Sequence, residues 1–148
     1  MRISIITIGA PKLPFVVTGF NEYTKRIATY NKLSILHIPD KKNAEKKVSH
    51  FVEKNKNAHC VLLDEKGKTY TSIEYAQKIE DAINRDGIQH IAFIIGGPNG
   101  HSEELKQKIS DHMSLSALTL PHDLAMLFLA EALYRSITIN HQHPYHRS

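Results

Sequence analysis

Cysteine is almost absent: Cys60 is the single one in 148 residues. A disulfide framework is thereby excluded, and a lone thiol inside an apolar run fits a reducing compartment, so we expect a cytoplasmic protein. No apolar stretch approaches the length that crosses a bilayer, and we expect no membrane association through such a helix. The first residues, MRISIITIGAPK, are too short and too strand-like for a signal peptide.

Several catalytic signatures are also missing. The chain has no G-x-S-x-G nucleophile elbow, no G-x-G-x-x-G dinucleotide fingerprint and no GK[ST] phosphate loop. Cys60 lies in a strand-like interior with no activating neighbour in the sequence. His141, His143 and His146 could bind a metal, but no cysteine or carboxylate completes a recognisable ligand set. The sequence therefore predicts neither a hydrolase of these types nor a metal centre.

The charge is unevenly distributed along the chain. The formal net charge is +4, with residues 1–68 holding 13 Lys/Arg against 6 Asp/Glu and residues 69–148 holding 6 against 9. The first part thus carries +7 and the second −3. Such a basic half suits phosphate groups, whereas the alternative is an ordinary solvated lysine-rich surface.

Strand-like and helix-like segments alternate throughout. This order is typical of a parallel sheet that helices cover on both faces, and 148 residues without a linker or repeat fit one α/β domain spanning residues 1–148. The expected strands are 2–9, 33–39, 59–64 and 89–95, with a turn at 65–68 after the third and a short strand or extended loop at 113–120. The expected helices follow Pro14, Asn43, Thr71, Ser102 and Pro121. Thr71 and Glu74 have the spacing of a capping box.

The last helix is apolar on almost every side. It is expected from Asp123 to Ile137, and Glu131 and Arg135 form its one well-spaced ion pair. A helix that is apolar all round is buried all round. In so short a chain, the same helix of a second copy is one plausible covering surface, which predicts a homodimer.

Ligands of open parallel sheets bind beyond the carboxyl ends of the strands. Three such ends stand out, at 63–65, 96–100 and 116–120. The paired glycines Gly96 and Gly97 let main-chain groups approach a ligand closely. The pattern favours a small, partly neutral ligand held by main chain, and the alternative is an ordinary strand-to-helix turn.

Five segments, in the same order, resemble the RlmH family of small SPOUT-class methyltransferases that act on the bacterial large ribosomal subunit. The resemblance runs essentially from end to end, and it includes the segment Thr18–Tyr23. The five segments are Leu63–Lys68, Phe93–Gly100, Leu115–His122, Ala130–Arg135 and His143–Arg147.

The resemblance implies an enzyme that methylates N3 of pseudouridine 1915, in helix 69 of 23S rRNA, in assembled ribosomes. It implies S-adenosylmethionine as cofactor, a homodimer, and a C-terminal trefoil knot. Sequence rules alone would exclude such a knot, because knots are very rare. The matching cofactor positions are Leu63, Gly96, Leu115, Ser116, Ala117, Leu118, Thr119 and Leu120.

Methyl transfer to a ring nitrogen needs positioning and help in removing the N3 proton. His122, at the start of the last helix, and the tail residues Tyr145, His146 and Arg147 are candidates, as is Arg135 for holding phosphate or negative charge. Each has a plain alternative: His122 as a helix cap, for example, and Arg135 as the partner of Glu131.

Two further functions remain open at this point. The first keeps the fold and the cofactor but changes the target to tRNA or a ribose 2′-hydroxyl. The second is a non-catalytic ribosome-binding dimer that uses only the basic first half and binds RNA with a steep salt dependence.

Overall fold

Five parallel strands form the central sheet of the computed structural model, which describes residues 1–147. Their order across the sheet is β2-β1-β4-β3-β5, with β1 at Arg2–Ile8, β2 at Lys32–Ile38, β3 at His59–Lys68, β4 at His90–Ile95 and β5 at Asp111–Met113. Within the same residues the helices are α1 at Pro14–Ala28, α2 at Ala44–Lys54, α3 at Ser72–Asn84, α4 at Glu103–Lys108 and α5 at His122–Asn140. The predicted α/β alternation and parallel sheet are confirmed.

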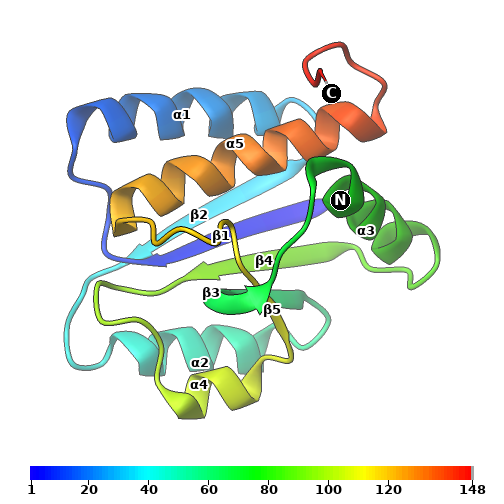
Figure 1. Ribbon diagram of the computed structural model, residues 1–148. Coiled ribbons are helices and arrows are strands. Elements are labelled where there is room, and N and C mark those ends of the chain that lie inside the picture. The colour runs from blue at the N-terminus through cyan, green and yellow to red at the C-terminus, as the bar shows by residue number, and fades with distance from the viewer. Residues whose placement is uncertain (148) are drawn as a thin grey trace.

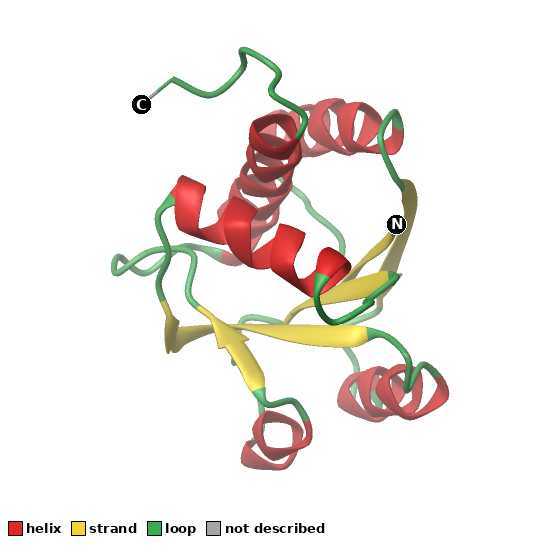
Figure 2. Ribbon diagram, turned by 90° about the vertical axis from the view of Figure 1, so that its right-hand side faces the viewer, coloured by secondary structure: helices red, strands yellow, loops and turns green. Residues whose placement is uncertain are grey.

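Strand β1 explains why both faces of the sheet are covered. Its residues from Ile3 to Ile8 are all buried, and successive side chains of a strand point to opposite faces. Ile3 and Ile5 pack with residues of α1, α3 and α5, whereas Ile6 and Ile8 pack with residues of α2 and α4. Figures 1 and 2 show the same two layers of helices, one on each side of the sheet.

Helix α5 lies on the sheet between α1 and α3 (Figure 1). Met126, Leu129 and Leu133 are fully or almost fully buried against the core, and Leu127 packs onto α1 beside Gly19. The all-round apolar character of this helix is thus largely satisfied within one chain, and Phe128 remains 43% exposed. The homodimer inferred from this helix stays a prediction.

The predicted turn at residues 65–68 is wrong. Strand β3 continues through this segment to Lys68 after an irregularity that begins at Leu63, and Lys68 pairs with Met113 of β5. Gly67 permits this pairing, because a Cβ atom there would lie 2.6 Å from the main-chain carbon of His112. A segment rich in turn-forming residues therefore becomes a bulged strand through its contact with β5.

The segment predicted as a strand or loop at residues 113–120 is mostly a loop. Strand β5 ends at Met113, and the chain then runs through a loop to α5. Hydroxyl groups fix this loop: Ser114 Oγ donates to the carbonyl of Ser116, and Ser116 Oγ accepts from the backbone N–H of Leu118. Serine side chains of this kind stabilise turns in place of a sheet ladder.

The predicted capping box of α3 is confirmed. Thr71 Oγ1 accepts from the N–H of Glu74, and the Glu74 carboxylate accepts from the N–H of Thr71. In the described part of the chain, no helix is long and apolar enough to cross a membrane. The trefoil knot that the resemblance implies stays a prediction.

Candidate active site

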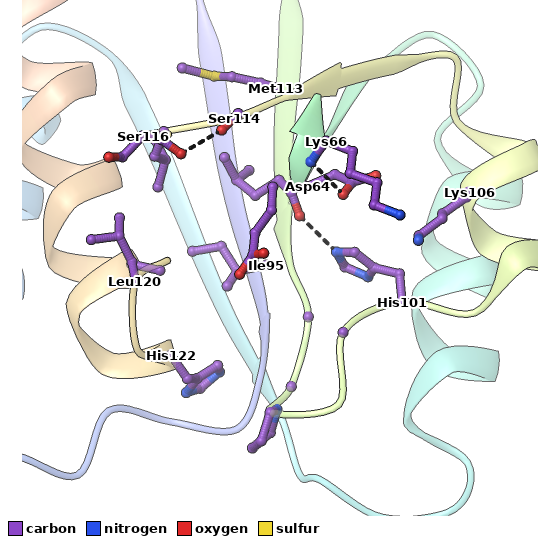
Figure 3. A pocket seen from close by; sticks show the side chains of 18 of the residues that line it. Asp64, Lys66, Ile95, His101, Lys106, Met113, Ser114, Ser116, Leu120 and His122 are labelled. Carbon is purple, nitrogen blue, oxygen red and sulfur yellow. Dashed lines mark hydrogen bonds between the residues drawn. The ribbon is translucent and has the colours of Figure 1, made fainter. Parts of the chain in front are cut away.

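A cavity of about 380 Å³ opens at the carboxyl ends of β3 and β4. Its other walls are the loop between β5 and α5 and the first turn of α5 (Figure 3). The volume is in the usual range for a small-molecule site. The predicted position, beyond three neighbouring strand ends, is where the cavity lies.

Six of the eight proposed cofactor residues line this cavity. Ala117 and Thr119 belong to the same loop but do not line it. Leu118 is 77% exposed at the rim, so its side chain is free to cover a ligand. The six lining residues are Leu63, Gly96, Leu115, Ser116, Leu118 and Leu120.

Gly96 gives the cavity wall its shape. A Cβ atom on Gly96 would lie 2.7 Å from Cε1 of His101, so only a residue without a side chain leaves this imidazole in place. His101 Nε2 donates to the carbonyl of Leu63, 3.0 Å away. Burial lowers the pKa of His101, so its ring is neutral near pH 7. Its Nδ1 is then a bare acceptor, buried and without a partner among residues 1–147.

One side of the cavity carries charge. Figure 3 shows Lys66, Lys106 and His101 around Asp64 on this side. Burial opposes ionisation of the Asp64 carboxyl, but the backbone N–H of Lys66 and the charge of Lys106 lower its pKa overall. Asp64 is therefore ionised near pH 7 and offsets one of the two lysine charges.

His122 closes the opposite side, at the first position of α5. It is not a side-chain cap of the helix, whose N-cap residue is Pro121. Its Nδ1 lies 3.6 Å from Asp123, and its Nε2 is buried with no hydrogen-bond partner in the described chain. His122 therefore lines the cavity and carries an imidazole nitrogen without a partner among residues 1–147.

The loop between β1 and α1 is tied to this end of α5. Asp123 Oδ2 accepts from the backbone N–H groups of Lys12 and Leu13, each at 2.7 Å. Burial opposes ionisation of Asp123, and these two hydrogen bonds lower its pKa nonetheless. The ionised carboxylate thus positions the residue next to it, His122.

The tail residues gather at the other end of α5. Arg135 pairs with Glu131 at 2.7 Å, lies 4.9 Å from the ring centre of Tyr145, and contacts Nδ1 of His146 at 3.0 Å. The Tyr145 hydroxyl contacts Tyr23 and Glu131. Burial and these neighbours raise the pKa of Tyr145, so its hydroxyl stays protonated at neutral pH.

The structure therefore divides the proposed catalytic residues into two groups. Arg135 lies thirteen residues beyond His122, which at a rise of 1.5 Å per residue is about 20 Å along α5. Arg147 is exposed at the end of the described chain. Within one chain, only His122 of the five lines the cavity.

The sequence matches a family described as "Predicted SPOUT methyltransferase" over residues 1–146. The chain belongs to the SPOUT methyltransferase family. A relative from Deinococcus deserti, named ribosomal RNA large subunit methyltransferase H, is 41% identical over 99% of this chain and 100% of its own length. This match covers nearly the whole chain, as the resemblance to the RlmH family does.

Solved structures show the same fold. A probable methylase family protein from Haemophilus influenzae Rd KW20 aligns with a TM-score of 0.59 at 14% identity, over 99% of this chain and 70% of its own. The SpoU methyltransferase AviRb from Streptomyces viridochromogenes, solved in complex with AdoMet, aligns with a TM-score of 0.50 at 13% identity, over 97% of this chain and 58% of its own. At these identities the likeness concerns the fold alone.

Sequence reasoning about this SPOUT methyltransferase missed three residues that shape the site. His101, Lys66 and Lys106 all line the cavity, yet none was singled out. His101 could have been found, because it directly follows the glycine-rich loop that ends β4. Lys106 could not, because its place depends on how α4 packs beside α2.

Proposed function

We propose that this SPOUT methyltransferase uses S-adenosylmethionine to methylate N3 of pseudouridine 1915 in helix 69 of 23S rRNA, in assembled ribosomes of the cytoplasm. The observation that carries the proposal is the cavity at the three strand ends, with Leu63, Gly96 and Leu118 on its walls. The name of the Deinococcus deserti relative supports an rRNA substrate.

The residues of the cavity fit this cofactor. Main chain at Leu63, Gly96 and the loop 115–120 would hold it, and His101 Nδ1 offers an unfilled buried acceptor for a hydroxyl or amino group. The ionised Asp64 carboxylate suits the positive charge of a sulfonium compound. When bound, the cofactor supplies an electrophilic methyl group.

The chain's own residues would handle the proton and the charge of the base. The N3–H of a uracil-type ring is weakly acidic, so a nearby acceptor helps the proton leave. His122 is the candidate acceptor, because its buried Nε2 has no partner within residues 1–147. Arg135 and Arg147 would hold phosphate or stabilise negative charge on the base, and Tyr145 and His146 would contact the nucleotide.

A homodimer would unite the two groups of residues. About 20 Å separates His122 from Arg135 along α5, too far for both to contact one base. A second copy, related by a two-fold axis, would bring its tail to the first copy's cavity. The second copy would also enlarge the RNA-binding surface.

Mass spectrometry of helix 69 fragments tests the proposed reaction. Ribosomes from a strain without this activity are treated with the protein and S-adenosylmethionine, beside free 23S rRNA and tRNA. We expect one added methyl group on pseudouridine 1915 in ribosomes. Methylation of tRNA or of a ribose 2′-hydroxyl instead would show that the enzyme acts on another RNA target. No methylation of any of these RNAs would favour the non-catalytic ribosome-binding dimer.

A further inference from the structure

A groove of about 500 Å³ runs between the edge strand β2 and helix α2, outside the cofactor cavity. Its floor is apolar: Leu36 is 47% exposed there, beside Ile38 and Phe51. One rim is formed by α2, and no residue of this rim belongs to the cavity described above.

The rim is strongly basic. His50 lies four residues after Lys46 and three after Lys47, and Lys54 lies four residues after His50. At these helical spacings the four side chains share one side of α2. Within residues 1–147 none of the three lysines has an ion-pair partner. Their charge is therefore not neutralised by the fold.

The acidic residues of α2 are held away from this rim. The Glu45 carboxylate accepts from the backbone N–H and the hydroxyl of Ser102, next to α4. Glu53 pairs with Lys108 of α4 at 2.8 Å. Helix α2 thus turns its carboxylates toward α4 and its lysines toward the groove.

The groove ends beside the cofactor cavity. Pro39 lines that end of the groove, and Asp40 follows it. Asp40 lies close to Gly97 of the cavity wall: a Cβ atom on Gly97 would be 3.5 Å from Oδ1 of Asp40. From Lys46 to Lys54, α2 rises about 12 Å. This length suits about two phosphates of a nucleic acid strand that continues away from the cavity.

We propose that this groove binds the sugar–phosphate backbone of the RNA that flanks the target nucleotide. The proposal rests on the proposed function, which places an RNA base at the adjoining cavity. Unpaired lysines along a groove match phosphates, and the exposed apolar floor matches the faces of unstacked bases, a combination common in single-strand binding. A purely solvated lysine surface would not need this floor.

The test compares the variant K46Q/K47Q/K54Q with the matched control K25Q/K32Q/R85Q, which removes equal charge from exposed positions elsewhere. Binding to protein-free helix 69 RNA is measured across a salt series. We expect the groove variant to bind about tenfold more weakly, with a salt slope shallower by about 2. The control should stay close to the wild type, and both should bind S-adenosylmethionine as the wild type does.

Two results would overturn the inference while leaving the proposed function intact. One is a groove variant that binds RNA like the control, while the wild type methylates ribosomes. The other is a groove variant that binds and methylates ribosomes as well as the control variant does. If the wild type methylates no RNA, the proposed function itself fails.

Discussion

Gly96 and His101 determine how much room the proposed cofactor cavity has. The imidazole lies over the glycine and donates to the carbonyl of Leu63, which is on the facing strand end. The wall therefore depends on one missing side chain and one hydrogen bond.

Replacing Gly96 with alanine should weaken cofactor binding. The new Cβ atom would lie 2.7 Å from His101 Cε1, so the ring must leave the Leu63 carbonyl or move toward the cavity. We expect the Kd for S-adenosylmethionine, measured by isothermal titration, to rise about tenfold. The double variant G96A/H101A removes the clash and should recover part of the affinity. Wild-type affinity in G96A would show that the wall tolerates a side chain.

Tyr145 tests whether the tail takes part in the reaction. Its hydroxyl contacts Tyr23 and Glu131, and Arg135 lies over its ring. We expect Tyr145→Phe to slow methylation of ribosomes about tenfold with unchanged cofactor affinity, because the tail loses its position. Tyr30→Phe is the matched control, since Tyr30 packs on His141 through its ring. A lower melting temperature with an unchanged rate would leave Tyr145 a purely structural role.

At the scale of elements, the pairing of β3 with β5 holds together one wall of the cavity. Gly67→Ala should break it, because the Cβ atom would lie within 2.8 Å of main-chain atoms of His112 and Met113, which cannot rotate away. We expect a loss of about 1–3 kcal/mol in the free energy of unfolding, measured by urea denaturation. The exposed neighbour Thr69→Ala serves as control. An unchanged unfolding free energy would mean that β5 shifts without cost.

The Asp123 carboxylate should make a pH-dependent contribution to stability. Its pKa is lower in the folded than in the unfolded chain. Its contribution is therefore complete above the unfolded pKa of about 3.9 and is lost as the pH falls through the folded pKa. Asp123→Asn should cost about 1–2 kcal/mol of unfolding free energy at pH 7, because two backbone N–H groups lose a charged acceptor.

This cost should shrink in urea titrations below about pH 4, where the wild-type carboxyl also becomes protonated. Asp86→Asn is the control. A cost that is equal at pH 7 and in acid would mean that the ionised carboxylate is not what holds the loop.

For the whole molecule, the order of layers was accessible from the sequence. Strands rich in β-branched apolar residues, such as Ile3–Ile8, require cover on both faces, and the topology rule for parallel sheets then places a ligand at their carboxyl ends. The motifs singled out the loop at residues 115–120, which lines the cavity. The environment of α5 was not accessible, because an apolar helix looks the same whether α1 and α3 or a second copy covers it. The bulge at Gly67 was also missed, since its cause lies 46 residues further on, at Met113.

The central claim of a shared site can be tested with mixed dimers. Leu118→Arg places a cation at the cavity rim on an exposed side chain, and deletion of the residues after Ile139 removes the tail. Each variant should be inactive alone. When both are co-expressed, half of the dimers are mixed and each has one intact pair of cavity and tail, so we predict about a quarter of the wild-type methylation of helix 69. No recovery in the mixture, with mixed dimers present, would contradict a site built from two chains.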